Sequence, residues 1–220
     1  MSRRRASRVV VATLAVALLA ACGGGNATAN IGAVAVRAGS PVSTALAEFD
    51  SVCGRPMDRD AYVAAAPGAG WVAFEPAAES PLGRLIAIGR AEIRDASTQT
   101  GEDTEGRFEN SAFRKTANGR ELVLLVTEGQ IPGMERSLEC GVYDLAAPAP
   151  TAAEIAAWTP TSANTRVNEQ GLTVYGWQPA FREGFNRITV THLDPSSPLS
   201  SQIPIAGLSI TAFQGPTTAE

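Results

Sequence analysis

The chain has 220 residues, 45% of them hydrophobic, with 18 basic and 22 acidic side chains and a formal net charge of −4 at pH 7. This length and hydrophobic content suffice for the core of one domain, or of two small ones. The acidic balance argues against a nucleic-acid partner, because an acidic surface repels phosphate.

The first 21 residues have the layout of a secretory signal peptide. Four arginines within the first eight residues precede the uncharged run Val9–Ala21. As a helix this run spans roughly 20 Å, which is short of the ~30 Å hydrocarbon core of a bilayer. Removing residues 1–21 takes away four arginines and no acid, so 14 basic residues face 22 acidic ones and the net charge is near −8.

The cleavage region, Leu19-Ala20-Ala21-Cys22, resembles the lipobox of bacterial lipoproteins. The resemblance implies that Cys22 becomes the new N-terminus, with a diacylglycerol on its sulfur and a further acyl chain, such as palmitate, on its nitrogen. Several chains anchor a protein stably, so the lipid bilayer is the expected partner. In Gram-negative lipoproteins an aspartate directly after the cysteine retains the protein in the inner membrane. Because Gly23 stands at that position, the resemblance implies that this protein is anchored in the outer membrane and faces the periplasm. The alternative is an ordinary secretory signal peptide that leaves Cys22 a free thiol.

Small residues dominate the stretch after this cysteine. Residues 22–40 carry a single charge, Arg37, and are expected to form the lipidated cysteine and a flexible tether. Residues 41–220 then form a globular domain, with a subdivision near 147–150 as an alternative.

Two helices are expected at the start of this domain. Val42, Leu46, Phe49 and Cys53 share one helical face, which should point into the core. A short second helix follows over 59–66, capped by Asp58, and a strand is expected over 71–75.

Strands are expected through the middle of the chain, over 82–93, 107–116 and 121–129. Asn118-Gly119 between the last two predicts a type I′ hairpin turn, because both central residues of that turn need a positive φ. The acidic cluster Glu102, Asp103 and Glu105 lacks the alternating spacing of a calcium loop and indicates a solvated loop.

A further strand is expected over 137–145. Its alternation turns Leu138, Cys140 and Val142 inward and Glu139, Gly141 and Tyr143 to the other side. With Cys22 lipidated in an oxidising compartment, the remaining pair Cys53 and Cys140 predicts a disulfide. Two buried reduced thiols are the alternative.

The C-terminal part begins with a helix after Thr151, which forms a capping box with Glu154. Three strands are expected after it, over 171–178, 186–193 and 205–213. The predicted fold is therefore α+β: a mostly antiparallel sheet with two N-terminal helices and one mid-chain helix, pinned by a disulfide.

Two sets of residues are candidates for a functional role. His192, the one histidine, lies on the strand face of Ile188 and Val190 and could act as a general base oriented by Asp194. No nucleophile stands beside it in the sequence, so a structural histidine is favoured. The aromatic residues Trp71, Trp158, Tyr175 and Trp177 could line a sugar or peptide groove, but core packing is favoured.

The stretch "FDSVC" followed by "AAAPGAGW" is similar to the openings of exported proteobacterial proteins, a likeness that implies no activity. The expected function is that of a membrane-anchored envelope lipoprotein with a binding or structural role and an envelope protein as partner. No cofactor, metal or catalytic residue is assigned. The alternatives are a periplasmic hydrolase with a site around His192, and an inhibitor of a basic envelope or exogenous enzyme.

Overall fold

The computed structural model of the chain describes residues 39–100 and 106–215. The predicted signal peptide, Cys22, most of the predicted tether and the acidic cluster at 102–105 lie outside these residues. Among the helices that are described, none has the length and apolar character needed to cross a membrane.

The described residues form one eight-stranded sheet and four α-helices, which confirms the α+β prediction. All neighbouring strands are antiparallel, in the order β1-β2-β3-β4-β8-β7-β6-β5. The strands are β1 (Val72–Ala73), β2 (Arg107–Ala117), β3 (Arg120–Gln130), β4 (Ser137–Asp144), β5 (Thr165–Glu169), β6 (Leu172–Trp177), β7 (Arg187–Leu193) and β8 (Gly207–Gln214). Residues 145–151 connect β4 to α4, and strands from both sides of this connection share the sheet.

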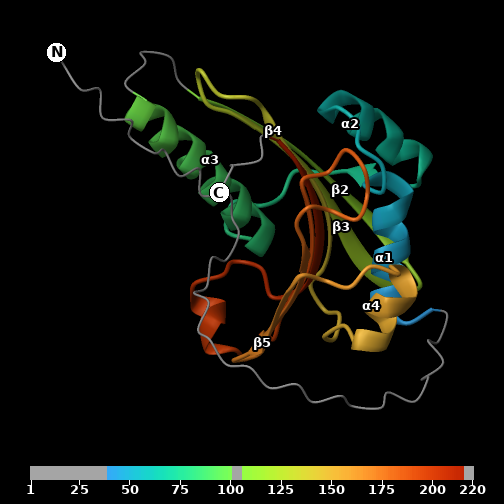
Figure 1. The fold of residues 1–220 in the computed structure, drawn as a ribbon. Coiled ribbons are helices and arrows are strands. Elements are labelled where there is room, and N and C mark those ends of the chain that lie inside the picture. The colour runs from blue at the N-terminus through green and yellow to red at the C-terminus, as the bar shows by residue number, and fades with distance from the viewer. Residues whose placement is uncertain (1–38, 101–105, 216–220) are drawn as a thin grey trace.

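The helices are divided unequally between the two faces of the sheet (Figure 1). The helices α1 (Pro41–Val52), α2 (Arg59–Gly68) and α4 (Ala152–Trp158) lie on one face, whereas α3 (Pro81–Thr100) lies on the other. The main core fills the first face, and a smaller apolar cluster lies between α3 and strands β2, β3 and β4. Among the described residues, no α-helix lies over the second face of β6, β7 and β8.

The disulfide between Cys53 and Cys140 is present, with the two Cα atoms 5.5 Å apart. It joins the residue that caps the C-terminus of α1 to the middle of β4. Val42, Leu46 and Phe49 lie on the same helical face as Cys53, and all four side chains are buried against the sheet. The predicted inward face of the first helix is thus confirmed.

The predicted strand over 82–93 is wrong, because these residues belong to helix α3. The run Leu85-Ile86-Ala87-Ile88 suits a strand as well as a helix, and short apolar runs do not separate the two. The Ser80 hydroxyl accepts a hydrogen bond from the Gly83 amide, which starts the helix. Leu82 and Ile86, four residues apart, are buried together on the face towards the sheet.

Strand β5 was missed, because a largely exposed edge strand has no apolar alternation to reveal it. It pairs with β6 through a turn at Gln170-Gly171, with φ values of 51° and 76°. The predicted hairpin turn at Asn118-Gly119 is confirmed, with φ values of 50° and 75°. Both turns use the left-handed backbone conformation that a tight hairpin requires.

The predicted capping box of α4 is also confirmed. The Thr151 hydroxyl accepts from the Glu154 amide, and the Glu154 carboxylate accepts from the Thr151 amide. Ser40, which caps α1, donates a 2.7 Å hydrogen bond to the same carboxylate. Burial opposes ionisation of Glu154, but these hydrogen bonds outweigh it and lower the pKa of the carboxyl. One carboxylate thus connects the N-termini of two helices.

Candidate functional site

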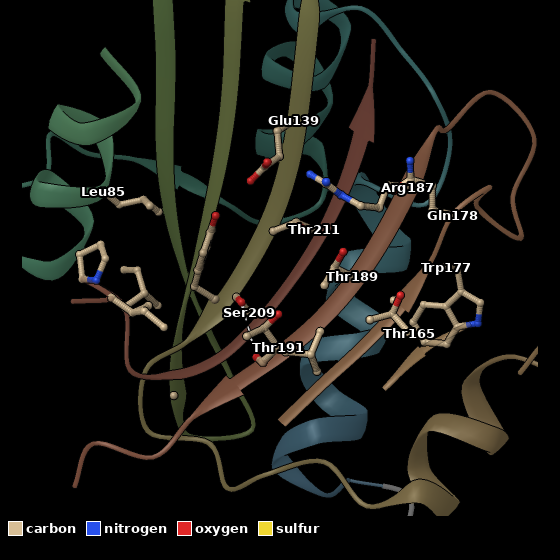
Figure 2. A pocket seen from close by; sticks show the side chains of 17 residues that line it. Leu85, Glu139, Thr165, Trp177, Gln178, Arg187, Thr189, Thr191, Ser209 and Thr211 are labelled. Atoms are coloured by element: carbon tan, nitrogen blue, oxygen red, sulfur yellow. Dashed lines mark hydrogen bonds between the residues drawn. The ribbon is translucent and has the colours of Figure 1, made fainter. Parts of the chain in front are cut away.

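A groove lies on the second face of the sheet, beside α3, over the strands β6, β7 and β8 that none of the described α-helices covers (Figure 2). Its volume is about 270 Å³, just below the range of ~300–1,000 Å³ in which drug-sized ligands bind. The floor is formed by strands β4 to β8, and the sides by α3, the segment before β8 and the end of β6. The size indicates a small ligand.

Hydroxyl groups form the middle of the floor. Thr189 on β7 lies directly opposite Thr211 on β8, and Thr191 lies opposite Ser209. Figure 2 shows these side chains with Thr165 along the floor. Within residues 39–100 and 106–215, none of the four threonine hydroxyls makes a hydrogen bond to another protein group. Thr189, Thr191 and Thr211 are partly buried and Thr165 is exposed, so water or a ligand completes the hydrogen bonds of their hydroxyls.

An acid, a phenol and a cation lie at one end of the groove. Glu139 and Tyr143 come from β4, and Arg187 comes from the start of β7. Gly141, between the first two, leaves room for the Tyr143 ring: a Cβ at this position would lie 3.1 Å from the Tyr143 hydroxyl. The guanidinium of Arg187 lies over the Phe213 ring, 5.3 Å from its centroid.

The pKa values at this end are perturbed. Burial raises the pKa of Glu139, while the positive charge of Arg187 and the Tyr143 hydroxyl act in the opposite direction. Glu92 on α3 adds to the rise through its negative charge, and burial raises its own pKa as well. Burial, followed by the charge of Glu139, raises the pKa of Tyr143 well above 10.0. Tyr143 is therefore a hydrogen-bond donor at neutral pH.

The carboxyl of Glu139, which is partly buried, gives a prediction about the stability of the fold. The pKa of Glu139 in the folded protein lies above the ordinary value of 4.5. At a pH between these two pKa values, the native state therefore holds a proton that the unfolded chain has lost. The free energy of unfolding should therefore fall as pH rises from the ordinary value through the raised one, and level off above it. We expect Glu139→Gln to flatten this decline, measured by urea unfolding between about pH 4 and pH 8. An unchanged slope in the variant would contradict the assignment, and Glu169→Gln, at an exposed position of β5 outside the groove lining, serves as the comparison.

The remaining wall of the groove is apolar. It consists of Leu85 on α3, Ile203, Pro204 and Ile205 before β8, and Val174 on β6. The groove therefore combines unpartnered hydroxyls, one acid and one cation with an apolar side. Such a surface can orient a small molecule through its polar groups and bury its apolar part.

The structure places His192 elsewhere. Its side chain is buried on the opposite face from the groove, and Nε2 lies 3.1 Å from the Ala147 carbonyl oxygen. Asp194 is exposed, and its carboxylate accepts hydrogen bonds from the amide and hydroxyl of Ser196. The disulfide between Cys53 and Cys140 also lies in the main core, away from the groove.

The aromatic residues pack in or against the main core, as predicted. Trp71 and Trp177 are 2% and 1% exposed, and Trp158 and Tyr175 are partly buried against the same core. Trp158 contacts Trp177 edge to face, and its indole N–H donates to Asp50. Trp177 also lines one end of the groove, but its indole N–H is used by the Thr161 carbonyl.

Sequence reasoning did not identify the groove residues. Glu139 and Tyr143 were placed correctly on the face opposite Cys140, and Thr189 and Thr191 on the face opposite Val190. The sequence feature that could have indicated the groove is the polar second face of these strands. A sheet face in contact with water has the same pattern, so this feature alone does not predict a binding site.

Among the described residues, no group of three or more histidine, cysteine, aspartate or glutamate side chains is arranged to hold a metal ion. Comparison of the chain with protein-family models, with curated proteins and with solved structures gave no match. Proposals about function therefore depend on the groove and on the N-terminal sequence.

Proposed function

We propose that this chain is an exported, lipid-anchored envelope protein that binds a small ligand in the groove on the second face of its sheet. The anchor is supported by the sequence Leu19-Ala20-Ala21-Cys22 behind a signal-like leader. Gly23 after this cysteine favours the outer membrane, with the domain facing the periplasm. Binding is supported by the groove.

The observation that carries the binding proposal is the set of unpartnered hydroxyls in the floor. Thr165, Thr189, Thr191 and Thr211 project from four positions of one sheet into the same hollow. A sheet face buried against a helix would be apolar, as the first face is. The second face instead offers donors and acceptors at fixed positions on rigid strands, an arrangement suited to recognition of a polar molecule.

Binding is favoured over hydrolysis around His192 by the position of that side chain. The imidazole faces the core side of β7, and its Nε2 is engaged with the Ala147 carbonyl. A ligand in the groove is separated from it by the sheet itself.

The anchor is tested by the intact mass of the mature protein extracted from bacterial membranes. We expect a chain that begins at Cys22 and carries the added mass of a diacylglycerol and an acyl chain. Cys22→Ser should abolish both the added mass and the membrane association, because a hydroxyl does not form the thioether. A wild-type chain without added lipid would overturn the anchor and leave the groove unaffected.

Binding is tested by non-denaturing mass spectrometry of the protein isolated from its own envelope. We expect a bound small molecule on the wild type and its loss from Thr189→Val/Thr211→Val, which removes two hydroxyls with little change in shape. Thr173→Val is the matched control, since Thr173 lies on β6 but on the opposite face from Val174. Equal occupancy of all three proteins, or of none, would contradict binding in the groove.

A further inference from the structure

The charged end of the groove suggests what the ligand carries, an inference that depends on the proposed binding function. Glu139 and Arg187 both lie opposite Phe213 on β8, one from each side. They therefore belong to one row across three strands, and two strand spacings separate their backbones by roughly 10 Å. Figure 2 shows the Arg187 side chain extending along the sheet towards the strand that carries Glu139, with Thr211 below both in this view.

The two charges do not pair directly. Within the described residues, the ion pairs closer than 4.0 Å involve other side chains, and Arg187 is absent from them. Its guanidinium is positioned by the Phe213 ring, so its N–H donors remain available. Glu139 is accompanied by the Tyr143 hydroxyl and, among the described residues, forms no ion pair within 4.0 Å, although the charge of Arg187 acts on it from further away. A positive and a negative group thus face one space, each without a full counter-charge.

A ligand with only one charge would leave the other group unmatched. A bare anion at Arg187 would be repelled by Glu139 and by Glu92, which acts on Glu139 from α3. A bare cation at Glu139 would be repelled by Arg187. A molecule that carries an ammonium and a carboxylate a few ångströms apart satisfies both groups. The Thr211 hydroxyl lies in the neighbouring row of the same face, two residues along β8 from Phe213, where it can accept from the ammonium or donate to the carboxylate.

The rest of the groove indicates the body of this molecule. The wall of Leu85, Ile203 and Ile205 offers apolar contact, and the volume of about 270 Å³ admits one small molecule. A sugar is less well matched, because sugars bind against exposed aromatic faces. The aromatic side chains that line the groove, Tyr143 and Trp177, are only 4% and 1% exposed.

We propose that the groove binds a free α-amino acid with an apolar side chain. The ammonium group lies at Glu139 and the Tyr143 hydroxyl, and the carboxylate lies at Arg187. The apolar side chain contacts the wall formed by Leu85 and Ile205. Thr189 and Thr211 hydrogen-bond the polar end of the ligand from below.

Isothermal titration calorimetry of the purified protein at neutral pH tests this assignment with four probes. L-leucine carries both charges, 4-methylpentanoate lacks the ammonium, 3-methylbutylamine lacks the carboxylate, and glucose is a neutral polyol. We expect L-leucine to bind, and each half-molecule to bind about tenfold or more weakly, because each loses one charge-assisted contact.

Single-residue variants assign the two charges. Arg187→Gln should weaken L-leucine and 4-methylpentanoate by about tenfold and leave 3-methylbutylamine no weaker. Glu139→Gln should weaken L-leucine and 3-methylbutylamine, which carry the ammonium, and leave 4-methylpentanoate no weaker. Arg166→Gln is the matched control, because this exposed arginine on β5 makes the same charge change outside the groove lining and should leave all affinities unchanged. Selectivity among probes separates a binding role from loss of folding.

The outcomes distinguish this inference from the broader proposal. If glucose or a half-molecule binds as tightly as L-leucine, and Thr189→Val/Thr211→Val abolishes that binding, the groove is a binding site but the amino-acid assignment is wrong. If no probe binds and the protein isolated from its envelope carries no small molecule, both proposals fail. Equal effects of Arg187→Gln on every probe would also overturn the assignment of the carboxylate.

Discussion

Removal of the Cys53–Cys140 disulfide is expected to lower the free energy of unfolding by about 4–5 kcal/mol. The bond joins residues 87 positions apart, and the loop between them contains α2, β1, α3, β2 and β3. Without the bond, the unfolded chain regains the conformational freedom of this long loop. Both sulfur atoms are buried in the main core, so the double alanine variant also loses their packing contacts, and the reduced wild type isolates the effect of the bond itself.

The measurement is urea unfolding of the Cys53→Ala/Cys140→Ala variant beside the wild type with and without a reductant. For a domain of this size, the melting temperature should fall by roughly 10 °C or more. Cys22→Ala is the control, since it removes a cysteine but leaves the disulfide in place, and its stability should equal that of the wild type. A variant as stable as the oxidised wild type would show that the bond adds nothing to stability.

Replacement of Arg120 by methionine is expected to destabilise the protein by about 3–5 kcal/mol. Arg120 at the start of β3 donates two hydrogen bonds, of 2.7 and 2.8 Å, to the carboxylate of Asp144 at the end of β4. The Asp144 side chain is 1% exposed, and its other contact is a hydrogen bond from the Ala146 amide. Without the arginine, a buried carboxylate loses its counter-charge and cannot regain water in its place.

The double variant Arg120→Met/Asp144→Asn separates this effect from lost packing. We expect it to be more stable than Arg120→Met alone, because no buried charge is left without a partner. Arg94→Met is the matched control: Arg94 pairs with Asp95, and their side chains are 62% and 67% exposed. Its removal should change stability by less than about 1 kcal/mol. Equal losses in all three variants, measured by urea unfolding, would refute the role of burial.

The two faces of the sheet have different roles in the proposed protein: the first supports the fold and the second carries the groove. Three helices and the disulfide hold the first face in a dry core, which makes the strands a rigid support. The second face has room for a ligand because α3 covers only its β2–β4 side. A groove carried by rigid strands holds its polar groups in place without a ligand, which favours selective binding.

Short-range patterns were sufficient for several parts of this fold. The turn at Asn118-Gly119 and the capping box of Thr151 and Glu154 depend only on residues that are close together in the sequence. The inward face of α1 follows from helical spacing, and the α+β class follows from the succession of strands. Pairing of Cys53 with Cys140 was predicted from the small number of cysteines together with the predicted signal peptide, and the structure contains this disulfide.

Contacts between residues far apart in the sequence determined the other parts of the fold and the candidate site. Leu82–Ile93 became a helix because its apolar face packs against β2 and β3, a partner that local propensity does not reveal. Glu139 and Arg187 lie 48 positions apart in the sequence and face the same groove only because β4 and β7 both pair with β8. Whether a polar strand face meets water, a helix or a ligand depends on where a distant helix is placed. Residue patterns therefore determined the elements and their inward faces, whereas the candidate site arose from strand order.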